Sequence, residues 1–458
     1  MTKTNDMTIG NVGRKIALFF IPVLLTSALQ QIYSFVDTLI VGQGLGDNAL
    51  GAVGNMGSLM FFVFGFSMGL TNGFAVTIGQ NFGASDEKAL KKSVAASIRL
   101  SAIIAAILTV VSLTSLKQIL ILLVTPEEIL NDSLKYGYVI FAGVVATIAY
   151  NLCSAVLRAL GDSRTPFFAI VFSTVFNIVF DWVAVFVIHT GVEGPAMVTV
   201  LAQVISVAIC MHKLRTIDII RPSREDFAVV RATDRTLLKN GIPMAAMNSI
   251  TAVGCMIVQY FINGMGVEFT SAYAVCSRYL NLFMTPAQTA GQTMSTFTSQ
   301  NFGAGKIDRI KEGLRKCLVI ALVSYVIFGS AMVFFPDLLA ARMLQGSMQI
   351  SLASGVLRRC GIMIFAVDIL FVIRSCCQGM GKPLVPMASG IAEMMLRIGV
   401  IALFVPRFGI NAAAFAEISA WVGALLMNTI AYFYHISRVG NGLEYRVARK
   451  RAFHYNSN

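Results

Sequence analysis

Five acidic residues lie inside long apolar stretches of this sequence, namely Asp37, Asp181, Asp368, Glu393 and Glu417. Most of the other acidic residues lie in the polar breaks between such stretches. A charged side chain at the centre of a membrane helix costs about 2.5–3.5 kcal/mol on insertion scales, so such residues mark a functional path by default. These five residues are therefore the first candidates for chemistry.

Two of the five carboxylates are predicted to lie at a similar depth. At 1.5 Å per residue, Asp37 lies about 33 Å from the start of its helix and Asp181 about 22 Å from the start of another, both past the midplane. Asn177 precedes Asp181 by four residues and projects from the same face. Thr199 lies about one turn into the following helix. Two carboxylates, an amide and a hydroxyl are thus expected to come together from three helices.

Such a set has two chemical uses. Oxygen ligands suit a hard cation such as Na⁺. Alternatively, two neighbouring carboxylates share a proton, because burial and each other's charge disfavour double ionisation. The residues could also simply satisfy one another's hydrogen bonds. We predict that an ion- or proton-coupling site is formed by Asp37, Asn177, Asp181 and Thr199. The one metal ion expected to bind there is Na⁺.

Other polar or soft side chains are candidates for a substrate cavity. Gln30 and Tyr33 lie near the face of Asp37, and methionines crowd the seventh and eighth helices. For Asp368, substrate contact, a proton relay and a structural hydrogen bond stay open. The predicted cavity residues are Gln30, Tyr33, Asp368, Met256 and Gln259. No residue is predicted to be catalytic.

The remaining buried charges are expected to be structural. Glu393 and Arg397 are four residues apart on one helix and can neutralise each other. Arg397 is nearly alone among basic residues at this depth. Glu417 lies near the outer end of its helix and is expected to reach water.

The elements that carry these residues are membrane helices. Hydrophobic residues make up 56% of the 458 residues and charged ones only 13%, against about 25% charged in soluble domains. The mean hydropathy is +0.73. A spanning helix needs about 20 apolar residues. We predict an all-α integral membrane protein with twelve helices at about 14–42, 53–83, 90–116, 134–160, 166–190, 195–214, 237–265, 271–303, 313–335, 351–380, 384–405 and 410–437.

The net charge of +13 is explained by membrane topology rather than nucleic acid binding. The two chain ends and every second break hold most of the 36 lysines and arginines. The positive-inside rule therefore predicts that both termini are cytoplasmic. The opposite side holds only Lys117, Lys135, Arg278, Arg342, Arg358, Arg359 and Arg407.

The two halves of the chain are related by a shift of 220 residues. Residues 80–84, Gln-Asn-Phe-Gly-Ala, recur unchanged at 300–304, and Gly161 and Pro166 recur as Gly381 and Pro386. Six helices per half predict lobes of equal orientation, related by a pseudo-twofold along the membrane normal. The predicted parts are an N-terminal lobe (1–214), a cytoplasmic linker (215–236), a C-terminal lobe (237–437) and a basic tail (438–458).

The second half does not repeat the ion site. The same shift places Ile257 at the position of Asp37, Arg397 at that of Asn177 and Ile401 at that of Asp181. The coupling site is therefore expected only in the N-terminal half. The repeated pentapeptide is expected to end a helix, with Gly83 and Gly303 in a left-handed cap. The eight cysteines are expected to be small buried hydrophobic residues.

Taken together, these features resemble the multidrug and toxic compound extrusion (MATE) family over essentially the whole chain. The resemblance is carried by Pro22, Gln30, Tyr33 and Asp37, by residues 80–84 and 158–162, by Asn177 and Asp181, and by Asp368 with Gln378-Gly379. It implies a V-shaped exporter of organic, often cationic, compounds in exchange for Na⁺ or H⁺, with the ion site at Asp37, Asn177, Asp181 and Thr199. One branch of the family has an acidic residue in the seventh helix, where this sequence offers only Gln259 among apolar residues.

Three other classes of membrane protein have less support in the sequence. A major-facilitator transporter lacks support because its Gly-x-x-x-Asp-Arg pattern is missing after the second helix. A flippase of lipid-linked substrates on the same fold would have an arginine-lined cavity. An enzyme would need a catalytic or metal-binding motif. We expect a plasma-membrane antiporter that is no enzyme and needs no cofactor besides its coupling ion. It is expected to be monomeric, with small organic substrates and the bilayer as its partners.

Overall fold

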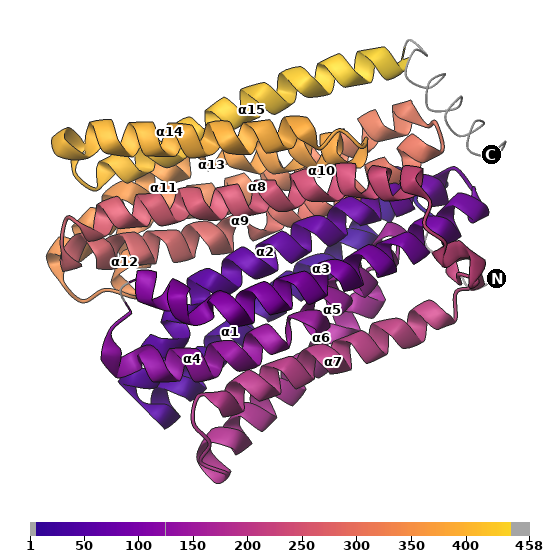
Figure 1. Cartoon of the computed structure of the whole chain (residues 1–458). Coiled ribbons are helices and arrows are strands. Elements are labelled where there is room, and N and C mark those ends of the chain that lie inside the picture. The colour runs from indigo at the N-terminus through magenta and orange to yellow at the C-terminus, as the bar shows by residue number, and fades with distance from the viewer. Residues whose placement is uncertain (1–5, 124, 441–458) are drawn as a thin grey trace. The chain divides into compact units, whose positions relative to one another are not determined.

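The computed structural model describes residues 6–123 and 125–440, and in this part of the chain all regular structure is helical (Figure 1). The chain divides into two compact units. Unit 1 contains Asp6 and Leu18–Ala245, and unit 2 contains Met7–Ala17 and the residues from Ala246 onwards.

Unit 1 is built from seven long helices and the first part of an eighth. The last of the seven is followed by two short 3₁₀ turns, η2 (Asp218–Ile220) and η3 (Glu225–Phe227). The helix α6 continues directly into a π-helical turn, η1 (Val183–Val187). The seven helices are α1 (Val12–Leu45), α2 (Asp47–Gly83), α3 (Glu87–Leu122), α4 (Glu127–Ala142), α5 (Val144–Ala159), α6 (Arg164–Trp182) and α7 (Glu193–Arg215).

Unit 2 takes over α8 (Arg231–Asn263) from Ala246. A π-helical turn, η4 (Tyr325–Gly329), joins two of its helices into one continuous rod. Its other helices are α9 (Val267–Gly303), α10 (Ile307–Ser324), α11 (Ser330–Phe334), α12 (Pro336–Ala341), α13 (Ser347–Gly379), α14 (Leu384–Phe408) and α15 (Asn411–Gly440).

The predicted helices differ from the structure in a few places. The range 134–160 corresponds to two helices, α4 and α5, which meet at a bend of 44°. The range 313–335 begins earlier, at Ile307, and the short helix α12 was not predicted. Ten helices of the described chain are long and apolar enough to span a membrane, or eleven if α4 and α5 form one span. The all-α membrane architecture is confirmed. The predicted number of twelve membrane-spanning helices is not exactly confirmed.

Among the long helices of the described chain, α9 is not apolar enough to meet the criteria for a membrane-spanning helix. It is rich in threonine and glutamine, which lower its hydropathy. Several of these hydroxyls bond to a carbonyl of their own helix four residues earlier, for example Thr289 Oγ1 to Thr285 O and Thr293 Oγ1 to Thr289 O, both at 2.9 Å. Hydroxyls satisfied in this way can be buried at low cost.

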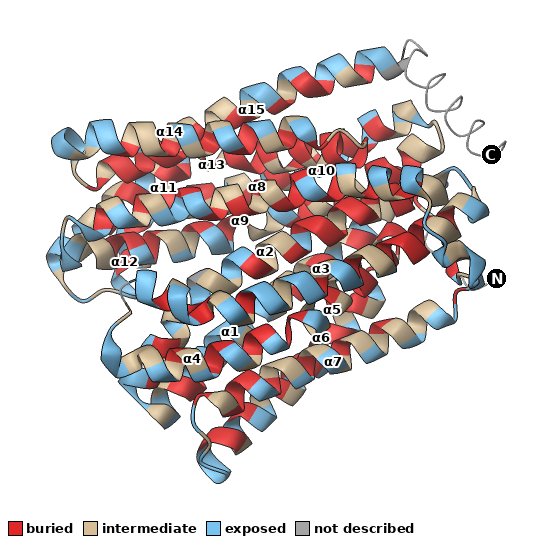
Figure 2. Ribbon diagram, viewed as in Figure 1, coloured by how far each residue is buried: buried red, intermediate tan, exposed pale blue. Residues whose placement is uncertain are grey.

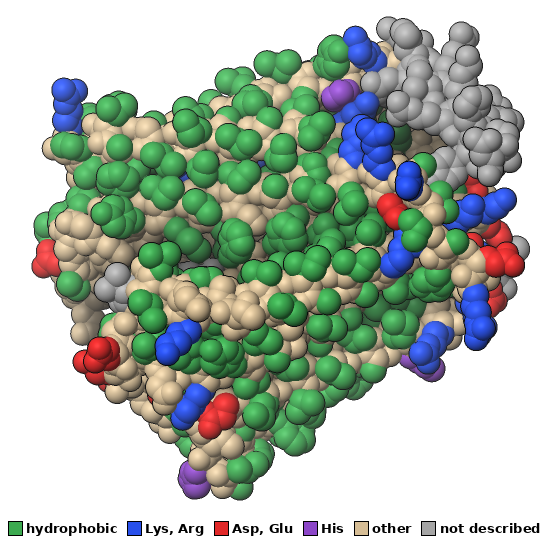
Figure 3. Space-filling model, in the orientation of Figure 1, with side chains coloured by type: hydrophobic (Ala, Val, Ile, Leu, Met, Phe, Trp, Pro, Cys, Tyr) green, Lys and Arg blue, Asp and Glu red, His purple; other side chains and the backbone are tan. Residues whose placement is uncertain are grey.

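The helix α6 illustrates how the sequence specifies a membrane fold. Phe168, Phe172 and Val175 on one face are 53%, 62% and 59% exposed, whereas Asn177 and Asp181 on the opposite face are at most 1% exposed. A helix of a soluble protein has the opposite arrangement. Figure 2 shows buried and exposed faces alternating around such helices, and Figure 3 shows hydrophobic side chains covering their outer surfaces.

The internal repeat is reproduced in local geometry. The helices α2 and α9 are both 37 residues long and follow glycines with positive φ, Gly46 (84°) and Gly266 (112°). At their ends, the amides of Ala84 and Ala304 donate to the carbonyls of Gln80 and Gln300. The pentapeptide therefore ends a helix, as predicted.

The prediction of where the left-handed residue falls was wrong. Gly83 and Gly303 are the last residues of their helices, and positive φ occurs two residues later, at Ser85 (57°) and Gly305 (72°). The amides of Asp86 and Lys306, just beyond, reach back to the Asn81 and Asn301 carbonyls. The chain thus makes one further turn before reversing.

Residues 7–17, at the start of the described chain, pack in unit 2. The Met7 amide donates to Gln300 Oε1 at 2.8 Å, and its carbonyl accepts from Arg309 Nη2 at 2.9 Å. Lys306 Nζ donates to Thr8 O at 2.8 Å and Arg309 Nη1 to Gly10 O at 2.9 Å. The second copy of the pentapeptide, with the first turn of α10, therefore anchors the N-terminal segment.

An analogous anchor exists in unit 1, ahead of α8. A shift of 220 relates Met7 to Phe227, whose carbonyl accepts from Arg99 Nη1 at 2.7 Å. Arg99 also forms an ion pair with Asp234. In both halves, an arginine thus holds the backbone that precedes the first helix of the repeat.

The helices α2 and α8 make a very close backbone contact within unit 1. A Cβ atom added to Gly73 would lie 2.5 Å from the Cα of Gly241, and one added to Gly69 would lie 2.6 Å from the Cα of Ala245. Small residues four apart on both helices let two backbones approach, as is common in membrane helix pairs.

The predicted division into lobes, linker and tail stays a prediction. The compact units differ from it in that unit 1 continues to Ala245 and residues 7–17 belong to unit 2. Of the predicted basic tail, residues 441–458 lie outside the described residues.

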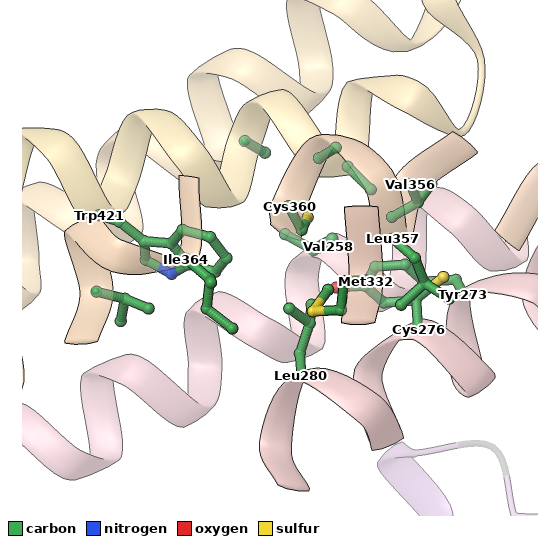
Figure 4. Packing of buried hydrophobic residues seen from close by; sticks show 14 of the residues in the cluster. Val258, Tyr273, Cys276, Leu280, Met332, Val356, Leu357, Cys360, Ile364 and Trp421 are labelled. Carbon is green, nitrogen blue, oxygen red and sulfur yellow. The ribbon is translucent and has the colours of Figure 1, made fainter. Parts of the chain in front are cut away.

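The core of unit 2 is dense and apolar. Trp421 of α15 packs near Ile364 of α13, and Met332 and Cys276 lie in the same cluster (Figure 4). Seven of the eight cysteines are buried free thiols, as expected, whereas Cys255 is exposed.

Candidate functional site

The predicted N-terminal ion site is assembled within unit 1. Asp37 lies on α1, Asn177 and Asp181 on α6, and Thr199 on α7. Asp181 is fully buried and Asn177 is 1% exposed, while Asp37 and Thr199 are partly buried. The polar face of α6 described above therefore points toward α1 and α7.

The Asp181 carboxylate is the centre of the site. The side chains of Asp37 and Asn177 lie beside it. Within the described chain, however, no donor meets either Asp181 oxygen with hydrogen-bonding geometry. Two adjacent carboxylates repel each other in a poorly hydrated environment, and a proton or a cation placed between them removes that repulsion. One bound positive charge would relieve this repulsion, as the sequence-based prediction of an ion site requires.

Neutral oxygens complete the set. Thr199 Oγ1 lies 3.1 Å from Tyr33 Oη and accepts from Asn177 Nδ2 at 3.4 Å. The Asn177 Oδ1 atom is buried without a partner among the described residues. Because the amide nitrogen faces Thr199, its oxygen is left for another donor or for a cation. Tyr33, predicted as a cavity residue, is therefore a direct neighbour of this site.

These atoms fit Na⁺ as well as a proton. The unpaired acceptors are carboxylate and amide oxygens, which hard cations prefer. Within the described residues, no three His, Cys, Asp or Glu side chains group closely enough to hold a metal ion.

Tyr136 of α4 was missed in the sequence. It is 3% exposed and lies close enough to Asp37, Tyr33 and Asp181 to interact electrostatically with all three. It follows Lys135, which indicated the outer boundary of a helix. The structure shows that α4 starts at Glu127, so Tyr136 lies about two and a half turns inside it. A predicted helix start at Glu127 would have placed Tyr136 inside the helix and so identified it as a candidate.

The other predicted cavity residues lie on α1, α8 and α13. Gln30 of α1 is exposed. On α8, Met256 is 37% exposed, and Gln259 Nε2 donates to Asn263 Oδ1 at 2.6 Å. Their role in substrate binding stays a prediction.

Asp368 of α13 is a lone buried carboxylate. It is 1% exposed, and neither of its oxygens has a hydrogen-bond partner among the described residues. Of its three interpretations, a structural hydrogen bond is not supported by the geometry. Substrate contact and proton relay stay open.

The buried charges of α13, α14 and α15 form a network in unit 2. Arg374 donates to Glu393. Arg397 lies 3.7 Å from Glu393 and 3.0 Å from Glu417. Glu393 and Arg397 thus do pair, as predicted. The expectation that Glu417 reaches water was wrong, because it is 7% exposed and bound to Arg397.

The network also corrects the prediction that Arg397 is nearly alone. Arg374, near the end of its helix, is 6% exposed. The two arginines and two glutamates of the network together have no net charge. Because Arg397 occupies the place of Asn177 in the repeat, unit 2 has a neutral ion-pair network where unit 1 has the candidate ion site.

A helical membrane architecture with an internal repeat and a buried acidic cluster is typical of transporters built from two related halves. The MatE family model matches residues 22–183 and 243–403, which cover most of both halves. The chain belongs to this family of membrane transporters.

Relatives and solved structures agree with that assignment. The probable multidrug resistance protein YoeA of Bacillus subtilis is 30% identical over 70% of each chain. The probable multidrug resistance protein NorM of Thermotoga maritima is 22% identical over 90% of this chain and 89% of its own. A crystal structure of MATE in the bent conformation has a TM-score of 0.91 at 18% identity and covers 97% of this chain and 100% of its own, which supports the fold.

Proposed function

We propose that this protein is a cation-coupled antiporter that exports organic compounds from the cytoplasm across the plasma membrane. The observation that carries the proposal is the buried Asp181 carboxylate, whose two oxygens have no hydrogen-bond partner among the described residues, beside the partly buried carboxylate of Asp37. Such a site gains most when it takes up one H⁺ or Na⁺. The names of the relatives YoeA and NorM describe multidrug resistance, which supports export as the direction.

The proposed mechanism is alternating access. The site accepts an ion when it faces outward, and ion binding removes the repulsion between the two carboxylates and lowers their negative charge by one. This change favours release of a substrate bound from inside and return of the protein to the inward-facing state. At 100 mV, each elementary charge that moves inward supplies about 2.3 kcal/mol, to which the ion gradient adds. Both termini are proposed to be cytoplasmic and the working unit to be a monomer.

The substrates are proposed to be lipophilic cations. Asp37 and Asp181 supply negative charge, and Asp368 adds a buried carboxylate without a partner in the described chain. Apolar contact contributes about 25 cal/mol per Å² of buried area with few directional constraints. Selectivity is therefore expected to be loose.

A vesicle assay tests this proposal. Inside-out vesicles containing the protein receive Na⁺ and pH gradients imposed separately, and uptake of a fluorescent cationic dye is measured. We expect one gradient to drive uptake and the other to have no effect, which identifies the coupling ion. Uptake that neither gradient changes would contradict coupling. Transport of an anionic or lipid-linked compound but of no cation would contradict the substrate class.

A further inference from the structure

Unit 1 contains a second feature, an apolar groove that the transport cycle proposed above does not use. It lies between α3, α5 and α7, with a volume of about 260 Å³, and extends to the segment that follows α7. Its inner wall is made by buried side chains that include Val94, Leu152 and Val156. An unfilled space of this size loses the dispersion contacts of its walls, so an apolar occupant is favoured.

The groove opens toward the membrane-facing surface. Ile98 and Ala102 of α3 and Val145 of α5 line it and are themselves exposed. A hydrocarbon chain can therefore enter sideways from the bilayer without crossing a polar barrier.

One end of the groove is basic. Arg215, the last residue of α7, and Arg221, just beyond η2, both line it and are both exposed. Neither guanidinium forms an ion pair within the described part of the chain. The one acidic residue between them in the sequence, Asp218, is exposed and leaves a local excess of positive charge.

The basic end lies on the side predicted to be cytoplasmic, since α7 ends there and the linker begins. The cytoplasmic leaflet is the one with a negative surface potential. An amphiphile with an apolar tail and an anionic head therefore matches the groove in both shape and charge. The lipophilic cations proposed as transported substrates do not, because both arginines repel them.

We propose that this groove is a binding site for an anionic phospholipid of the cytoplasmic leaflet. One acyl chain lies between α3, α5 and α7, and the phosphate is held by Arg215 and Arg221. The site joins three helices of unit 1 to the start of the linker, so an occupied site stabilises this part of the protein. This inference does not depend on the proposed export activity.

Native mass spectrometry of the purified full-length protein tests the proposal. The probes are phosphatidylglycerol and, at equal concentration, zwitterionic phosphatidylcholine. We expect preferential binding of phosphatidylglycerol to one site. Each arginine near a membrane surface contributes about fivefold to anionic lipid binding, so Arg215→Gln combined with Arg221→Gln is expected to weaken binding about 25-fold. The matched control is Arg164→Gln with Arg224→Gln, two exposed arginines outside the groove, which should leave binding unchanged.

A second pair of variants tests the tail site separately. Ala102→Phe fills the groove from its exposed side, whereas Ile103→Phe changes the adjacent exposed residue, which does not line the groove. We expect loss of phosphatidylglycerol binding in the first variant only. Equal binding of both lipids, or unchanged binding in the double arginine variant, would overturn the proposal. Displacement by inorganic phosphate alone, or by a transported cationic dye, would also overturn it.

Discussion

Asp37 and Asp181 belong to one site because each carboxylate lies beside the other in a buried setting. Asp37→Asn and Asp181→Asn keep the side-chain shape but remove the charge that attracts the ion. We expect both variants to reduce gradient-driven export to the level of empty vesicles while the protein stays folded in the membrane. The measurement is dye uptake together with a thermal melting curve.

The matched control for this experiment is Asp47→Asn. Asp47 lies in the exposed first turn of α2, and its replacement is expected to leave export unchanged. Export at the wild-type rate in both site variants would place the coupling site elsewhere.

Arg397 is predicted to matter for stability rather than for coupling. Its replacement by leucine leaves Glu417 buried without its ion partner, which costs about 3–5 kcal/mol in the free energy of unfolding. Replacing Glu417 by leucine as well removes the unpaired charge, so the double variant is expected to be more stable than Arg397→Leu. Denaturant titration in detergent measures both effects.

The control for the buried Arg397–Glu417 pair is Lys311→Ala, which removes an exposed ion pair. Lys311 and Asp308 form an exposed pair at 3.4 Å, which contributes at most about 1 kcal/mol. A double variant less stable than Arg397→Leu would contradict the expected rescue by the second substitution.

The sequence predicted the acidic site because unpaired charge in an apolar stretch is rare and costly. It did not reveal the partners of Arg397. Arg374, near the end of its helix, was not among the residues expected at membrane depth, and Glu417, near the start of another helix, was expected to reach water. The depth of a residue along its own helix does not show which side chains of neighbouring helices contact it. Both errors arise because the sequence does not show these contacts between helices.

At the scale of helices, the contact of α2 with α8 depends on glycine. Gly73→Ala puts a methyl group 2.5 Å from the Cα of Gly241, and backbone cannot move aside cheaply. We expect a lower melting temperature and less folded protein. Gly57→Ala on the same helix meets nothing within 4 Å. The better helix propensity of alanine then makes it neutral or slightly stabilising. Equal melting temperatures would show that the helices can separate without cost.

Helix positions were largely predictable, since runs of apolar residues and the charges between them define them. The bend between α4 and α5 was not, because Gly143, where it occurs, lies in an uninterrupted apolar run. A Cβ there would lie 2.3 Å from Val200 Cγ2. This glycine is needed for the approach of α7, a tertiary requirement that the local sequence does not express.

For the whole molecule, the distribution of basic residues predicts the side of each break. Arg224→Cys in the linker and Glu128→Cys at the start of α4 are both exposed positions. In a Cys255→Ser background, a membrane-impermeant maleimide applied to intact cells should label the cysteine at 128. The cysteine at 224 should react only after permeabilisation. The opposite pattern would invert the predicted topology.

The attachment of residues 7–17 to unit 2 has a consequence for synthesis. Met7 leaves the ribosome early, but Gln300, to which its amide bonds, lies 293 residues later. At about 5–20 residues per second, the first segment waits roughly 15–60 s for its partner. During that interval α1 is inserted while the segment before it lacks its final contacts. A nascent chain stalled before residue 300 should therefore be cleaved by a cytoplasmic protease ahead of α1, whereas the completed protein should resist cleavage there.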